Sequence, residues 1–212
     1  MNESDRHDSQ PSNCHDFYLD AEETDCQSCE LQSSFNCHPT AEDHNFYRFN
    51  LLPTIITGLL GMAGALVILK NWLPLIIVAA ASFIFWGLGL EVRLLCTHCP
   101  YYGKEGDRLK CWALRKYPKR WKYRPGPLSR AERALIWLMY AVIAGIPLLT
   151  MASGAGIVIL NYQDYSFLAL LGTAGLLIAY IFSGVHMLMV KKRVFCSKCA
   201  NIYCLLNEAP PK

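Results

Sequence analysis

Long stretches without charge divide this chain. Asp, Glu, Lys and Arg are absent from four segments: residues 51–69, 72–90, 134–163 and 165–190. A bilayer core of roughly 30 Å needs about 20 apolar residues in helical form, so each segment is long enough to cross a membrane. The pattern predicts an all-α membrane protein with four transmembrane helices, arranged as two repeated helical hairpins that are each followed by a CxxC knuckle.

The segments around these helices complete the predicted organisation. We expect an acidic Cys/His-containing tail, a first transmembrane hairpin, a basic Cys loop, a second transmembrane hairpin and a Cys tail. Their predicted ranges are residues 1–49, 50–91, 92–133, 134–190 and 191–212.

Positive charge indicates which segments share one side of the membrane. Of the 20 Lys and Arg residues, 12 lie between residues 91 and 133 and 5 follow Val190, whereas residues 161–164 between the last two spans have none. Short loops rich in Lys and Arg stay cytoplasmic. We therefore expect an integral membrane protein with both termini and the basic loop in the cytoplasm. The start MNESDRHDSQ lacks the apolar core of a cleaved signal peptide.

Two segments match at an offset of 100 residues. They are Arg93-Leu-Leu-Cys96-Thr-His-Cys99 and Arg193-Val-Phe-Cys196-Ser-Lys-Cys199, and each follows a predicted span. A duplicated unit is the simplest explanation, and two unrelated hairpins are the alternative. Parallel repeats are related by an axis along the membrane normal, so both CxxC motifs would emerge at the same depth on the same face.

All ten cysteines lie outside the predicted spans. Cytosolic thiols are normally reduced, which favours metal ligation over disulfides. Two CxxC motifs suit a tetrathiolate zinc site, and tetrahedral sulfur also suits iron. Cys111 and Cys204 are then either spare, or part of two three-thiolate half-sites that His98 or another group completes, or ligands of an iron–sulfur cluster. The candidate metal ligands are Cys96, Cys99, Cys196, Cys199, Cys111 and Cys204. Zinc is the expected cofactor, iron or an iron–sulfur cluster the alternative, and thiol redox chemistry the third possibility.

The acidic tail holds weaker candidates. Its composition cannot bury enough apolar surface to fold alone, although metal ligation could replace a core. The candidates are Cys14, Cys26, Cys29, Cys37 and His38. The alternative is a disordered tail with incidental cysteines, and electrostatic docking of the tail on the basic loop is plausible in either case.

The basic loop interleaves cations with aromatic residues between Lys116 and Pro127. Such a segment suits anionic lipid headgroups at a membrane interface. An acidic protein partner competes with lipid, and nucleic acid is not expected. Ser129-Arg-Ala-Glu132 then has the capping-box pattern of a helix start.

Several functional classes are disfavoured. The uncharged spans argue against a proton-coupled pump or an ion transporter. His186 is the only histidine in a span, which argues against bis-histidine haem; it could contact a quinone, but a hydrogen bond to a neighbour is the commoner role. Catalytic motifs such as G-x-S-x-G, H-E-x-x-H and the P-loop are absent. The missing motifs favour a non-catalytic role, with an enzyme as the less favoured alternative.

Three motifs carry a resemblance to other proteins. His98-Cys99-Pro-Tyr-Tyr102, Trp121-Lys-Tyr-Arg-Pro-Gly-Pro127 and the Cys196/Cys199/Cys204 tail resemble a group of small cysteine-rich four-helix membrane proteins of anaerobic prokaryotes. The resemblance covers residues 51–208. It implies a prokaryotic host, and so the prokaryotic plasma (inner) membrane as the location, but no activity.

The expected function is a metal-stabilised membrane anchor or accessory module that docks a cytoplasmic or membrane protein partner. A membrane electron carrier with an iron–sulfur or rubredoxin-like centre that serves the quinone pool is the first alternative. A thiol or metal redox sensor, with Cys111 and Cys204 as the responsive thiols, is the second.

Overall fold

The computed structural model describes residues 39–103, 106–199 and 204–205. Within these ranges the chain is helical, apart from loops and one isolated antiparallel bridge between Arg108 and Pro118. The main helices are α3 (Ala41–Leu69), α4 (Leu73–Ser82), α5 (Leu90–Leu94), α6 (Pro100–Gly103), α7 (Arg130–Tyr140), α8 (Ile146–Leu160) and α9 (Phe167–Val190). Three π-helical segments extend them, namely η1 (Phe83–Gly87), η3 (Ala141–Gly145) and η4 (Lys191–Phe195), and two short 3₁₀ turns are η2 (Cys96–His98) and η5 (Cys196–Lys198).

Three continuous helical segments are long and apolar enough to cross a membrane. They run over Ala41–Leu69, Arg130–Leu160 and Phe167–Lys198. The segments Leu73–Gly87 and Leu90–His98 meet at a bend of 52° and give a fourth span if they are taken together. The predicted all-α chain with membrane-crossing helices is confirmed at this level, with three or four spans.

Polar caps begin the helices where the sequence pattern changes. The predicted capping box at Ser129 and Glu132 is confirmed: Ser129 Oγ accepts from the Glu132 N–H at 3.2 Å, and the Glu132 carboxylate accepts from the Ser129 N–H at 3.0 Å. Thr40 and Asp43 form a second capping box, so α3 begins at Ala41, before the uncharged stretch that starts at residue 51. The first turns of α3 therefore extend beyond its apolar part.

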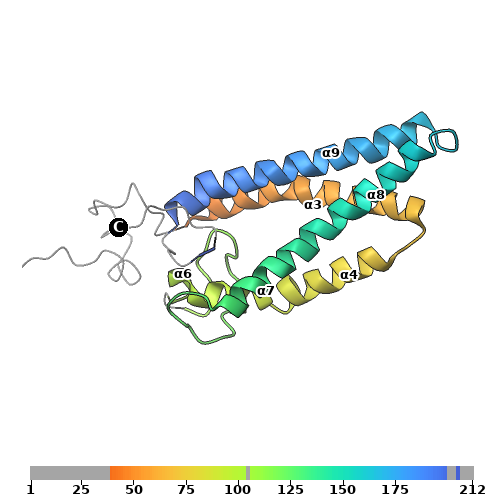
Figure 1. Ribbon diagram of the computed structural model, residues 1–212. Helices are drawn as coiled ribbons and strands as arrows, with labels where there is room; N and C mark the ends of the chain where they lie inside the picture. The colour runs from red at the N-terminus through yellow and green to blue at the C-terminus, as the bar shows by residue number, and fades with distance from the viewer. Residues whose placement is uncertain (1–38, 104–105, 200–203, 206–212) are drawn as a thin grey trace, which may run out of the picture.

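Close contacts at glycines fix the centre of the bundle. A Cβ added to Gly154 of α8 would lie 2.8 Å from Ala65 Cβ and 3.0 Å from Ala65 Cα of α3. On α3, Gly58 faces the ring of Tyr180 in α9. Small residues allow membrane helices to approach each other closely. Helices α3, α8 and α9 consequently pack along one another, while α4 packs mainly against α8 and η3 (Figure 1).

The bend after η1 depends on one glycine. Gly89 has φ +77°, in the left-handed region that favours glycine. A Cβ at this position would collide with Tyr117 Oη and would lie 2.8 Å from the Trp121 ring. Gly89 thus turns the chain from η1 into α5 and lets the following loop pack against the bend.

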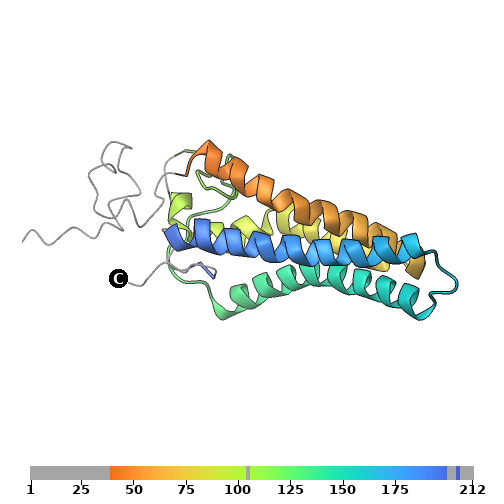
Figure 2. The ribbon, with the colours of Figure 1, turned by 90° about the horizontal axis from the view of Figure 1, so that it is seen from above.

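The start of α3, helix α6, the start of α7 and the end of α9 all lie at one end of the bundle (Figures 1 and 2). We name residues 95–103 and 106–128 at this end the loop cap. Buried Val92, Tyr102 and Leu109 form one apolar cluster beneath it, and Leu94, Leu128 and Ile136 form another. The loop cap is therefore a packed layer on the helix ends.

Candidate thiol site in the loop cap

The two CxxC segments adopt the same backbone turn. Leu95 and Phe195, which precede them, have φ/ψ of −99°/−51° and −100°/−51°. Cys99 and Cys199, which close them, have φ/ψ of −89°/134° and −80°/127°. In each turn the N–H of the second cysteine donates to the carbonyl of the first, at 2.9 Å for Cys99 and 3.3 Å for Cys199.

The hydroxyl residue inside each CxxC segment has the same contact. Thr97 Oγ1 donates to the carbonyl of Arg93 at 2.6 Å, and Ser197 Oγ donates to the carbonyl of Arg193 at 2.6 Å. Each bond ties a cysteine turn to the helical turn before it. The hydroxyl shared by the two sequence segments thus performs the same structural task in both.

The thiols of the two turns lie within electrostatic reach of each other. Cys196 and Cys199 are buried, and Cys96, Cys99, Cys111 and Cys204 are partly buried free thiols. Burial raises the pKa of Cys99 well above its ordinary value, and the thiols of Cys111, Cys199 and Cys96 raise it further. Cys199, which follows η5, therefore lies within electrostatic reach of the loop-cap thiol Cys99, one hundred residues earlier in the chain.

Backbone N–H groups point at two of these sulfurs. The N–H groups of Ala113 and Leu114 donate to Cys111, and the N–H of Tyr101 donates to Cys99. These bonds lower the pKa of the two thiols, against the larger effect of burial. Hydrogen bonds to sulfur favour the thiolate, which is the form that binds metals.

Across the described part of the chain, no group of three or more His, Cys, Asp or Glu side chains is placed closely enough to hold a metal ion. The ligand assignments to Cys96, Cys99, Cys196, Cys199, Cys111 and Cys204 therefore stay predictions. The weaker candidates of the acidic tail, which are Cys14, Cys26, Cys29, Cys37 and His38, lie outside the described residues.

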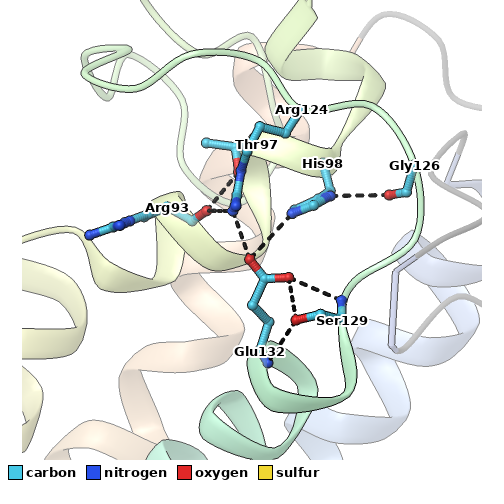
Figure 3. Close-up of polar contacts among 7 residues, drawn as sticks. All are labelled: Arg93, Thr97, His98, Arg124, Gly126, Ser129 and Glu132. Carbon is cyan, nitrogen blue, oxygen red and sulfur yellow. Dashed lines mark hydrogen bonds and ion pairs between the residues drawn. The ribbon is translucent and has the colours of Figure 1, made fainter.

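His98 is held by contacts with the loop cap and with α7. Its side chain is buried, and its Nδ1–H donates to the Gly126 carbonyl at 3.1 Å (Figure 3). Its Nε2 lies 3.7 Å from Glu132 Oε1. Nδ1 is therefore hydrogen-bonded, whereas the buried Nε2 has no hydrogen-bond partner among the described residues. Nε2 is the nitrogen that would be left for a metal.

Arg124 completes this polar cluster, and the sequence analysis did not single it out. Its Nη2 donates to Glu132 Oε1 at 2.9 Å and to the Arg93 carbonyl at 3.1 Å, and its backbone N–H donates to the Thr97 carbonyl at 2.8 Å (Figure 3). One residue of the loop cap therefore ties the first CxxC turn to the start of α7. The capping-box pattern located Glu132, but nothing in the sequence paired it with Arg124.

Aromatic rings connect the two cysteine segments. Trp112, next to Cys111, stacks on Phe195, next to Cys196, with ring centroids 4.4 Å apart and planes at 18°. Tyr47 of α3 meets Trp112 edge-on at 5.0 Å. This aromatic cluster thereby joins three parts of the chain: the start of α3, the loop cap and the segment after α9.

Two polar contacts lie at the junction with the long helices. Tyr140 Oη donates to Glu91 Oε1 at 3.0 Å, which joins α5 to α7. His186 Nε2 lies 3.2 Å from Asn50 Oδ1, so this histidine has the hydrogen-bonded neighbour expected of a lone histidine in a span.

No protein-family model, curated protein or solved structure matches the chain. The resemblance drawn from the three motifs therefore stays an expectation.

Proposed function

We propose that this protein is a membrane module whose loop cap binds a thiolate-preferring metal ion, zinc foremost, and that the metal fixes the helix ends that present a docking surface. The observation that carries the proposal is the pair of CxxC turns, one hundred residues apart, with one backbone conformation at one end of the bundle. In this proposal the two turns descend from a duplicated hairpin, and Cys96, Cys99, Cys196 and Cys199 are its principal ligands.

The chemistry of the cap supports thiolate ligation. Cys199 and Cys111 both act electrostatically on Cys99, so thiols from both halves of the chain lie within electrostatic reach of one another. Because like charges disfavour each other, several neighbouring thiolates need a cation to compensate them. A divalent ion with Zn–S bonds of about 2.3 Å would draw the sulfurs closer than they lie without it. If each CxxC turn instead forms a half-site of three thiolates, Cys111 and Cys204 would supply the third thiolate of each.

The rest of the cap suits docking. Cations lie over aromatic rings in it: Arg120 lies 6.0 Å from the ring centroid of Tyr117, and Lys119 lies 5.8 Å from that of the buried Tyr102. Such a surface at a membrane interface attracts anionic headgroups or an acidic protein. In this proposal the loop cap faces the cytoplasm of a prokaryotic cell.

The test is metal analysis of the full chain, purified anaerobically in detergent, together with its absorption spectrum. We expect about one zinc per chain and no visible absorption. Cys199→Ser and Cys96→Ser should each lose the zinc and lower the melting temperature. Lys70→Gln, at the end of α3 and outside every candidate ligand set, is the control and should keep both.

The same measurement separates the alternatives. Iron with acid-labile sulfide and visible absorption that bleaches on reduction would replace the zinc proposal with the electron carrier. A metal-free protein that forms a Cys111–Cys204 disulfide on mild oxidation would replace it with the redox sensor. Zinc that persists in every CxxC variant would also overturn the ligand assignment.

A further inference from the structure

We propose that the acidic N-terminal tail, residues 1–38, docks on the cationic face of the loop cap in its own chain and occupies the surface that an anionic partner would use. The cationic face is defined here by the exposed side chains of Arg108, Lys110, Lys116, Arg120 and Lys122. The inference depends on the charge of the loop cap and does not require a bound metal.

The cationic face concentrates charge of one sign. Residues 106–124 contain eight Lys and Arg residues and one Asp, a net charge of +7. Burial lowers the pKa of Lys119, and the nearby ammonium of Lys110 lowers it further. Crowded like charges make the ionised state less favourable. An anion on this face would relieve that repulsion.

The tail carries the complementary charge. Residues 1–38 contain nine Asp and Glu residues and a single Arg, a net charge of −8. Five of the nine acids fall between Asp16 and Asp25. The two segments nearly neutralise each other, whereas the chain as a whole has a formal net charge of +3.

The described chain begins on the loop cap itself. Arg115 Nη1 donates to the carbonyl of Pro39 at 2.7 Å, directly after the tail. His44 Nδ1 lies 2.8 Å from the Trp112 carbonyl, which fixes the first turn of α3 to the same loop. The point where the tail joins the bundle is therefore attached beside the cationic face.

Tethering makes this docking favourable. Any segment of 38 residues with random-coil dimensions would have a root-mean-square length of about 35 Å, enough to extend over the loop cap. Exposed ion pairs are individually weak, but attachment at Pro39 gives the tail a high effective concentration at the face. Because the Debye length is about 8 Å at physiological ionic strength, the docked state should dissociate as salt is raised.

The first experiment is carbodiimide crosslinking of the full chain in neutral detergent, followed by mass spectrometry. The reagent joins carboxylates directly to lysine amines that they touch. We expect crosslinks from tail acids to Lys110, Lys116 or Lys122, with the yield falling sharply at about 0.5 M salt. A mixture of ¹⁵N-labelled and unlabelled protein separates links within a chain from links between chains.

Charge variants that keep the lysines test the cause. Arg108→Gln combined with Arg120→Gln should reduce the crosslinking yield several-fold, because two cations of the face are removed and its lysines stay. Lys70→Gln, at the opposite end of the bundle, is the control and should leave the yield unchanged. An equal loss in both variants would overturn the proposal.

A second measurement uses a fluorescent peptide of residues 1–38 with its cysteines replaced by serine. The full chain should bind it weakly, and a full chain with the nine tail acids changed to Asn or Gln should bind it about tenfold more tightly or better. Equal binding by both proteins, or crosslinks only between chains, would show that the tail does not occupy its own loop cap. Displacement of the crosslinks by vesicles rich in phosphatidylserine would support the proposal and identify anionic lipid as a competitor.

Discussion

At the scale of single residues, Glu132 connects three parts of the chain. Its carboxylate caps α7 through Ser129, accepts from Arg124, and lies 3.7 Å from the buried ring of His98 (Figure 3). The Arg124 side chain is about half exposed, so that ion pair alone contributes little. The stabilising contribution of Glu132 comes mainly from the helix cap, because the Ser129 N–H loses its acceptor without it.

We therefore predict that Glu132→Ala destabilises the loop cap. Loss of the capping interaction should cost about 1–2 kcal/mol and lower the melting temperature in detergent. Arg133→Ala removes an exposed charge from the next position of α7 and should have little effect. Equal melting temperatures for Glu132→Ala and the wild-type chain would contradict this account of the cluster.

Gly89 gives a second prediction at this scale. Gly89→Ala would strain a backbone with φ +77° and push a methyl group against Tyr117 and Trp121. We expect the loop cap to separate partly from the bend, and so we expect faster proteolysis within residues 106–124. Gly106→Ala is a matched control, since Gly106 has φ +100° but an added Cβ there meets nothing within 4 Å. If both variants are digested at similar rates, backbone strain alone explains the effect.

At the scale of helices, the contact between α3 and α8 holds the bundle together. Gly154 brings the two backbones so close that a Cβ would lie 3.0 Å from Ala65 Cα. Gly156, two residues later on the same helix, has nothing within 4 Å of such a Cβ. One helix therefore supplies both the test position and its control.

Gly154→Ala should destabilise the bundle by about 1–3 kcal/mol, the usual cost of overpacking. Gly156→Ala should leave stability unchanged or raise it slightly, because alanine favours helix. Thermal unfolding in one detergent, followed by circular dichroism, compares the two. A larger loss at Gly156 than at Gly154 would place the close helix contact elsewhere.

The helices themselves could be predicted from the sequence, because loss of charge over about 20 residues is a local property. Their ends were less predictable. α3 starts at Ala41 because Thr40 caps it and Tyr47 packs on Trp112, a residue 65 positions away in the chain. The bend at Gly89 likewise depends on Tyr117 and Trp121. Contacts of this range leave no periodic signal in the sequence.

The candidate site was predictable to a similar degree. The repeated Arg–CxxC pattern indicated two equivalent segments, and the structure gives both one turn with one hydroxyl contact. The approach of Cys111 to Cys99 and the pairing of Arg124 with Glu132 arise from the folding of the loop cap. Neither follows from residue spacing.

At the scale of the whole molecule, the two ends of the bundle differ in what connects the helices. The short turns at residues 70–72 and 161–166 lie at one end, and the loop cap and the end of α9 lie at the other (Figure 2). Most cations follow the same division, since residues 70–72 carry one, Lys70, and residues 161–166 carry none. Under the rule that positive loops stay inside, this division predicts that the loop cap faces the cytoplasm.

We predict that reporter fusions will confirm this orientation in a bacterial host. Green fluorescent protein joined after Lys212 should be fluorescent, because it would remain in the cytoplasm. Alkaline phosphatase inserted after Gln163 should be active, because it would reach the periplasm. The reverse pattern would place the ten cysteines in an oxidising compartment and favour disulfides over metal ligation.

The π-helical segment η3 sets the angular relation between the two halves of one long span. A π turn is equivalent to a single residue inserted into an α-helix, and each residue of an α-helix turns the chain by about 100°. Residues 141–145 thus change the rotation of α7 about the helix axis relative to α8. With this rotation α8 faces α3, while Ile136 and Glu132 of α7 face the loop cap. Deleting one residue there would keep the span helical while rotating α7 away from its partners. The packing of the loop cap against the bundle therefore depends on this one-residue insertion.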